Sequence, residues 1–103
     1  MDINKAQKKV IENKINKGFN TTNINLEFNL LYGEVAEAFD AYLKKTDNLP
    51  SELADVAIYL MDIAELLGIS LEDEIIKKME INENRIYKVV DGKWIKIEND
   101  HKE

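Results

Sequence analysis

The sequence predicts an all-α helical bundle of about four helices, followed by a short C-terminal β-hairpin. Two observations carry the helical part. Apolar residues recur at spacings of three and four through most of the chain, and short polar stretches or single glycines separate the segments. A third observation predicts the hairpin, because two short strand-like runs flank an Asp-Gly dipeptide near the C-terminus.

The first two helices are delimited by their apolar spacing. A short amphipathic helix is expected over about 4–17, and Gly18 supplies its stop signal. A polar stretch from Asn20 to Asn23 follows it. Apolar residues then recur at helical spacing from Leu26 to Leu43, which predicts the longest helix of the chain.

Two further helices follow a loop at 44–49. Pro50 opens the third helix in its first turn, where proline is tolerated, and this helix is expected to reach about Leu67. Ser70 then resembles an N-cap for a fourth helix that extends to about Tyr87.

The end of the chain predicts a hairpin over about 87–98. Asp91-Gly92 suits a two-residue type I′ turn between the two runs. The residues at 99–103, with the single histidine His101, read as a polar tail. We therefore expect a single domain over 1–103, helical over 1–88, whose hairpin braces a subunit interface.

Composition limits the classes of function. The formal net charge of -6 argues against nonspecific nucleic-acid binding, which requires a basic face. The absence of cysteine excludes disulfides and thiolate zinc sites. Neither a long apolar run nor a signal peptide is apparent, so we expect a cytoplasmic protein with no membrane partner.

Two acidic pairs lie on neighbouring predicted helices. Glu34 and Glu37 are three residues apart, and so are Glu52 and Asp55, so each pair shares one helix face. If the two helices are antiparallel, the two acidic pairs lie at the same height along the helix axes. Four neighbouring carboxylates raise one another's pKa, and a hard divalent cation relieves this repulsion. The pattern therefore predicts a site for Mg²⁺, with Mn²⁺ as a substitute, and points to phosphate chemistry.

A second group of polar residues lies on the fourth predicted helix. Lys78, Asn82 and Arg85 form one stripe that can bind phosphates, because lysine and arginine supply positive charge and asparagine supplies an amide. The alternative for these residues taken alone is a solvated helix face.

These motifs together resemble the MazG-like members of the all-α nucleoside triphosphate pyrophosphohydrolases. The family pattern E-E-x-x-E, then E-x-x-D, appears as Gly33-Glu34-Val35-Ala36-Glu37 and Glu52-Leu53-Ala54-Asp55, and a K-x-x-x-N-x-x-R segment begins at Lys78. Gly33 departs from the family, where a glutamate is common. The resemblance covers most of the chain.

The resemblance implies an enzyme that cleaves a nucleoside triphosphate to the monophosphate and pyrophosphate. It implies magnesium bound by the four matching carboxylates, Glu34 as the candidate base, and a homodimer or a dimer of dimers. Lys78 and Arg85 are then expected to stabilise charge on the leaving group, and Asn82 to position the substrate. Phosphoribosyl-ATP pyrophosphohydrolase and dimeric dUTPase are related alternatives.

Three further residues are candidates near this site. Tyr59 follows Asp55 by one helical turn and is expected to contact a sugar or base. Glu27 and Asp62 lie seven residues outside the two pairs. They either extend the acidic face or, more often for such residues, form surface charges or subunit salt bridges.

Two other classes of protein remain as alternatives. A non-catalytic nucleotide-binding or regulatory bundle would keep the helices without hydrolysis, although the intact acids count against it. A di-iron carboxylate bundle would normally carry Glu-x-x-His motifs, and no histidine lies in the predicted helices.

Overall fold

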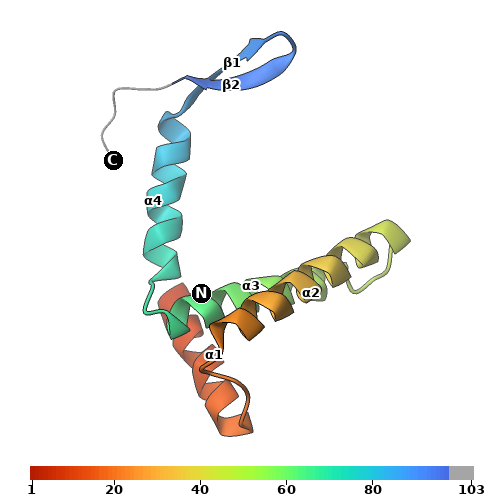
Figure 1. Ribbon diagram of the computed structural model, residues 1–103, viewed down its shortest axis with the longest axis vertical. Helices are drawn as coiled ribbons and strands as arrows, with labels where there is room; N and C mark the ends of the chain where they lie inside the picture. The colour runs from red at the N-terminus through yellow and green to blue at the C-terminus, as the bar shows by residue number, and fades with distance from the viewer. Residues whose placement is uncertain (98–103) are drawn as a thin grey trace. The chain divides into compact units, whose positions relative to one another are not determined.

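The computed structural model describes residues 1–97 and divides into two compact units, Met1–Leu71 and the chain from Glu72 onward. Its elements, coloured along the chain in Figure 1, are α1 (Ile3–Lys17), α2 (Ile24–Lys44), α3 (Leu49–Leu66), α4 (Leu71–Asn84), β1 (Ile86–Val90) and β2 (Lys93–Ile97). The predicted all-α class with a C-terminal hairpin is confirmed. The predicted polar tail at 99–103, and residue 98 of the predicted hairpin, lie outside the described residues.

The helix ends follow the local signals of the sequence. The side chains of Asp2 and Asn23 accept hydrogen bonds from backbone N–H groups of the first turns of α1 and α2. Pro50 occupies the first turn of α3, as expected. Gly18 follows α1 with a φ of 74°, a left-handed conformation that glycine adopts without steric cost.

In the first unit, α2 and α3 lie side by side and α1 packs against α3 (Figure 1). Few apolar side chains are buried there, and all of them come from α2 and α3: Leu31, Ala38, Ala41, Met61, Ile63 and Ala64. Large apolar side chains remain exposed along the same two helices, including Phe39, Tyr42 and Leu53. No helix within residues 1–97 is long and apolar enough to span a membrane.

A buried glutamine fixes α1 against the end of α3. Gln7 is 3% exposed, and its amide Nε2 donates to Glu65 Oε1 at 3.0 Å and to the carbonyl oxygen of Ile69 at 2.9 Å. Its Oε1 accepts from the N–H of Leu71 at 3.0 Å. These bonds satisfy a buried polar group and hold the segment that follows α3.

The second unit departs from the sequence prediction at one boundary. The fourth helix ends at Asn84 rather than near Tyr87, because the β-branched run that begins at Ile86 pairs with β2. The strands are antiparallel, with Ile86 opposite Ile97. Asp91 and Gly92 have φ values of 52° and 75°, as a type I′ turn requires, so the predicted turn is confirmed.

Replacing Gly92 with valine is expected to weaken the hairpin by about 1–2 kcal/mol, because a β-branched residue is strained at positive φ. Amide hydrogen exchange in β1 and β2 measures this effect, and faster exchange is the expected result. Asp91→Asn is the matched control, since asparagine tolerates the left-handed region. Unchanged exchange in the valine variant would contradict the assigned turn.

Candidate metal centre and neighbouring pocket

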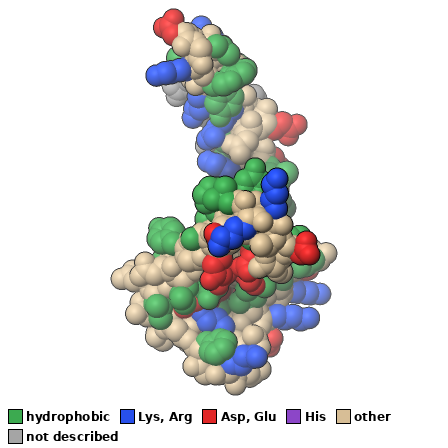
Figure 2. Space-filling model, turned by 90° about the vertical axis from the view of Figure 1, so that its right-hand side faces the viewer, with side chains coloured by type: hydrophobic (Ala, Val, Ile, Leu, Met, Phe, Trp, Pro, Cys, Tyr) green, Lys and Arg blue, Asp and Glu red, His purple; other side chains and the backbone are tan. Residues whose placement is uncertain are grey.

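Three of the four predicted metal ligands converge in the first unit. Glu34 and Glu37 on α2 and Glu52 on α3 each offer a carboxylate oxygen, and these oxygens all lie within 4.8 Å of one another. Acidic side chains gather on the face of the molecule shown in Figure 2. The three carboxylates are close enough to share one cation.

Local structure explains this convergence. Glu34 and Glu37 project from the same face of α2 because they are three residues apart. Glu52 lies in the first turn of α3, where Asn48 Nδ2 donates to its Oε1 at 3.2 Å. The short connection after α2 sets α3 beside it, so the two acidic faces meet.

Asp55 lies next to this group without joining it. It is exposed, and it is not one of the three carboxylates whose oxygens converge. Its charge nevertheless raises the pKa of both Glu34 and Glu52, which places it within electrostatic reach of them. The structure therefore brings together three of the predicted ligands and sets the fourth at their edge.

The three carboxylates have the chemistry of a divalent-cation site. Partial burial raises the pKa of Glu34, and the charge of Glu37 raises it further. Burial and the charge of Glu37 likewise raise the pKa of Glu52. Glu34 Oε2 and Glu52 Oε2 are shielded from solvent and have no hydrogen-bond partner among residues 1–97. An all-oxygen donor set with unpartnered oxygens fits Mg²⁺ or Mn²⁺.

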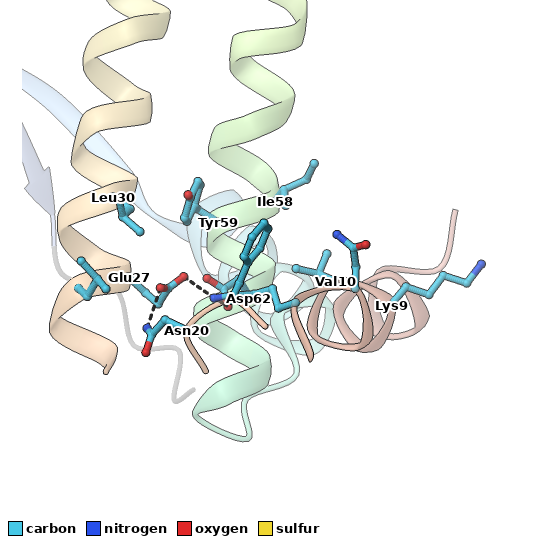
Figure 3. Close-up of a pocket in the computed structure, with 12 residues that line it drawn as sticks. Lys9, Val10, Asn20, Glu27, Leu30, Ile58, Tyr59 and Asp62 are labelled. Carbon is cyan, nitrogen blue, oxygen red and sulfur yellow. Dashed lines mark hydrogen bonds and ion pairs between the residues drawn. The ribbon is translucent and has the colours of Figure 1, made fainter. Parts of the chain in front are cut away.

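A pocket of about 690 Å³ opens between α1, α2 and α3 (Figure 3). The surface of its walls is mostly apolar, although polar side chains also contribute to it. The lining residues are Lys9, Val10, Asn13, Lys14, Phe19, Asn20, Leu26, Glu27, Leu30, Ile58, Tyr59 and Asp62. Concave, largely apolar pockets of this size with a few fixed polar groups commonly bind small molecules.

Tyr59 connects the pocket with the carboxylates. It lines the pocket, and burial raises the pKa of its hydroxyl, with a further contribution from the charge of Glu34. The tyrosine therefore lies in the electrostatic field of the acidic group while forming part of the pocket wall. The expected contact of Tyr59 with a sugar or base stays a prediction.

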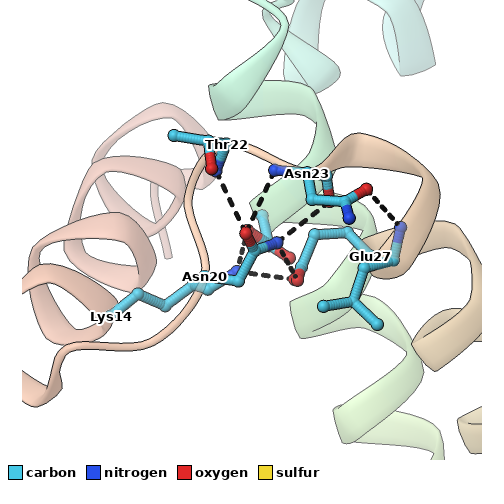
Figure 4. A network of polar contacts seen from close by, with 7 residues as sticks. Lys14, Asn20, Thr22, Asn23 and Glu27 are labelled. Carbon is cyan, nitrogen blue, oxygen red and sulfur yellow. Dashed lines mark hydrogen bonds and ion pairs between the residues drawn. The ribbon is translucent and has the colours of Figure 1, made fainter.

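A buried charge cluster forms one wall of the pocket, and Figure 4 shows the part of it around Lys14, Asn20 and Glu27. We define it as the Lys14 cluster: Lys14, Asn20, Glu27 and Asp62. Lys14 Nζ lies 2.5 Å from Glu27 Oε1 and 2.9 Å from Asp62 Oδ1. Glu27 and Asp62 are only 1% and 2% exposed. The interpretation of these two acids as surface charges is therefore wrong, because a lysine from α1 neutralises them inside the unit.

The ionisation of the cluster reflects this burial. Burial acts to raise the pKa of Glu27, but hydrogen bonds with Asp62, Asn20 and Lys14 outweigh it, so the pKa is lowered. Burial raises the pKa of Asp62 to about 6, and its hydrogen bond with Glu27 adds to the rise. Burial acts to lower the pKa of Lys14, but its hydrogen bonds to both acids leave the pKa raised.

The stability of the folded chain should depend on pH through the ionisation of Asp62. The pKa of Asp62 in the folded chain, about 6, exceeds the ordinary value of 3.8. The protonated carboxyl therefore stabilises the fold fully below pH 3.8, and this stabilisation is lost as pH rises through about 6. Between about pH 4 and pH 7, wild type should therefore lose stability relative to Asp62→Asn, which stays neutral. Urea unfolding of both proteins across this range measures the difference. A difference independent of pH would contradict the assignment.

The predicted phosphate-binding stripe lies on α4. Lys78 and Asn82 are exposed and Arg85 is half-buried. Arg85 Nη1 donates to Asn82 Oδ1 at 2.9 Å, so these two side chains already form a pair. The stripe belongs to the second unit, and its part in substrate binding stays a prediction.

Comparison with known proteins gives one partial similarity. A stretch of 36 residues is 53% identical to a protein of Salmonella phage PMBT28 named dATP/dGTP diphosphohydrolase. This stretch covers 35% of the chain and 12% of that much longer protein. No protein-family model and no solved structure matches. The chain thus shares about a third of its length with a protein named as a nucleotide hydrolase.

Proposed function

We propose that the protein is a metal-dependent hydrolase that cleaves nucleoside or deoxynucleoside triphosphates to the monophosphate and pyrophosphate. The observation that carries this proposal is the convergence of Glu34, Glu37 and Glu52. A pocket of nucleotide-binding size lies in the same unit, and its lining residue Tyr59 is in the electrostatic field of Glu34. The partial similarity to a dATP/dGTP diphosphohydrolase supports it and favours purine deoxynucleotides as substrates.

The acidic group supplies the catalytic part of the site. Glu34, Glu37 and Glu52 would hold a divalent cation, with Asp55 at the edge of the group, and the cation would supply charge neutralisation at the phosphates and orientation of the attacking water. Glu34 is the candidate base, because one of its oxygens is shielded from solvent and, in the described part of the chain, has no hydrogen-bond partner to compete for a proton. Without a cation, the negative charge of these carboxylates would repel a triphosphate.

The pocket supplies the nucleoside part of the site. Apolar side chains such as Leu30 and Ile58 offer surfaces for a flat base, and Tyr59 stands between this pocket and the field of Glu34. A nucleotide whose base lies in the pocket would extend its phosphates toward the acids. Such placement uses binding energy remote from the reacting bond to orient the triphosphate.

Residues of the second unit and a second subunit also belong to the proposed enzyme. Lys78 and Arg85 stabilise negative charge on the leaving pyrophosphate, and Asn82 positions the substrate. The exposed apolar side chains of α2 and α3, Phe39 and Tyr42 among them, favour a homodimer or homotetramer, because a patch of this kind is usually covered in solution. Light scattering at micromolar concentration tests the assembly.

The experiment that tests the function is a panel of ribo- and deoxynucleoside triphosphates assayed with Mg²⁺ or Mn²⁺ for pyrophosphate release. Equal amounts of pyrophosphate and monophosphate, with dATP and dGTP among the best substrates, are expected. Folded protein that binds nucleotide and releases no pyrophosphate from any of them would overturn the proposal. That result would favour a non-catalytic nucleotide-binding bundle.

Tyr59→Phe provides a separate check on the pocket. Loss of the hydroxyl is expected to raise KM for dATP about three- to tenfold, in keeping with the loss of one hydrogen bond to the sugar or base. The ring remains, so folding should be unaffected. An unchanged KM and kcat would remove Tyr59 from the substrate-binding residues.

A further inference from the structure

The ammonium group of Lys14 has a donor that the protein does not use. An ammonium carries three N–H donors. Two of them go to Glu27 Oε1 and Asp62 Oδ1, and within residues 1–97 no third partner is found. The side chain of Lys14 is 11% exposed and lines the pocket, so the remaining donor is available to a bound molecule.

Glu27 and Asn20, two other members of the Lys14 cluster, already form hydrogen bonds within the protein. Glu27 accepts from Lys14 with one oxygen and from Asn20 Nδ2 with the other, at 2.8 Å. Asn20 Nδ2 also donates to the carbonyl oxygen of Asn23, and its Oδ1 accepts from the N–H groups of Thr22 and Asn23. Figure 4 shows these bonds around the Asn20 amide. Asn20 therefore has no hydrogen-bonding capacity left for a ligand.

Asp62 also offers no accessible acceptor. Its Oδ1 accepts from Lys14 at 2.9 Å, and its Oδ2 is shielded from solvent. The cluster thus presents one charged donor and no free acceptor to the pocket. A ligand that hydrogen-bonds to this wall must bring an acceptor atom to Lys14. The faces of such a ligand would contact apolar neighbours such as Leu30 and Ile58 (Figure 3).

We propose that Lys14 is a specificity-determining residue that donates its unused N–H to a ring nitrogen shared by adenine and guanine, N3 or N7. This inference rests on the proposed function, which places the base in the pocket. Adenine and guanine differ at position 6, where one carries a donor and the other an acceptor. A lone donor aimed at N3 or N7 accepts both bases.

The burial of the cluster supports a role in recognition. A buried ion pair is often no more stabilising than apolar residues of the same volume. In the pocket wall, the buried charges can position a ligand-binding group. Glu27 and Asp62 hold the lysine in place, and Asn20 holds Glu27. A donor fixed in this way loses little entropy when it binds a ligand.

Deaza analogues test the inference from the ligand side. NMR shift titrations, which detect millimolar binding, compare deoxyadenosine with its 3-deaza and 7-deaza forms, each lacking one ring nitrogen. One of the two replacements should weaken binding at least about tenfold, as expected for a hydrogen bond to a charged group. Equal binding of all three nucleosides, or no binding of deoxyadenosine, would overturn the inference.

Paired variants test it from the protein side. Lys14→Met combined with Glu27→Gln removes the lysine and one of its two acidic partners, which limits the cost of unpaired buried charge to Asp62. Glu27→Gln alone is the matched control, because it retains Lys14. Sensitivity to the critical deaza replacement should persist in the control and disappear in the double variant. Sensitivity that persists in the folded double variant would assign the contact to another residue.

The outcomes separate this inference from the proposed function. Nucleoside binding needs neither a cation nor hydrolysis, so Lys14-dependent recognition without pyrophosphate release would leave the inference standing and remove the enzyme. Pyrophosphate release from dATP, 3-deaza-dATP and 7-deaza-dATP with equal KM would preserve the enzyme and remove the role of Lys14.

Discussion

Glu37→Gln should lower kcat/KM for dATP by at least about 100-fold, because a bound cation contributes several kcal/mol to transition-state stabilisation. Glu37 is one of the three converging carboxylates, and its charge raises the pKa of both Glu34 and Glu52. The amide keeps the shape of the side chain but removes its charge. Asp55→Asn is expected to act in the same direction, and with a smaller effect, because Asp55 lies at the edge of the group.

Asp40→Asn is the matched control for this prediction. Asp40 lies on the same helix, is exposed, and pairs with Lys44 at 3.0 Å outside the acidic group. Its replacement should leave the rate unchanged. Thermal unfolding gives an independent readout, since Mg²⁺ should raise the Tm of wild type and of Asp40→Asn but not that of Glu37→Gln. Equal rates for Glu37→Gln and wild type would contradict a catalytic role for the cluster.

The largest effect on stability is expected from Lys14→Met. This change leaves Glu27 and Asp62 as neighbouring buried carboxyl groups without their cation, at a cost of about 3–5 kcal/mol. Urea unfolding at neutral pH measures the loss. Part of the cost should be recovered when Glu27→Gln is added, because one of the two buried carboxyl groups is then replaced by a neutral amide.

Lys44→Met is the comparison that isolates burial as the cause. Lys44 forms an exposed pair with Asp40 on α2, and the loss of such a pair changes stability by less than about 1 kcal/mol. The two variants remove the same chemical group from opposite environments. A similar small effect for both would show that the Lys14 cluster does not hold α1 to the other helices.

The helices and the hairpin could be predicted because their signals are local. Glycine at 18, proline at 50 and the Asp91-Gly92 dipeptide each act within one turn of the chain. The end of α4 was harder to place, because the residues near Ile86 fit either a helix or a strand. Pairing with β2, a contact with another part of the chain, decides between them.

The acidic site could be predicted for a similar reason. Glu34 and Glu37 share a helix face by their spacing alone, and the short connection between α2 and α3 brings Glu52 to them. The exact membership of the group was not predictable, since it depends on the register of two helices. The structure leaves Asp55 at the edge for this reason.

The Lys14 cluster was missed because α1 is rich in lysine and resembles a solvated helix. A signal was nevertheless present. Lys14 follows Val10 by four residues and Ile11 by three, so it lies on the apolar face of α1. The buried partners Glu27 and Asp62 come from two other helices, and periodicity within one helix does not reveal such a contact.

The most direct test of the central claim is a ³¹P NMR time course of dATP with the protein and Mg²⁺. The triphosphate signals are expected to be replaced by those of dAMP and pyrophosphate in equal amounts, and Glu37→Gln is expected to leave dATP intact. Signals of dADP with phosphate, or of deoxyadenosine with triphosphate, would show a different bond being cleaved. Those products, or intact dATP after incubation with folded wild-type protein, would contradict the proposed pyrophosphohydrolase activity.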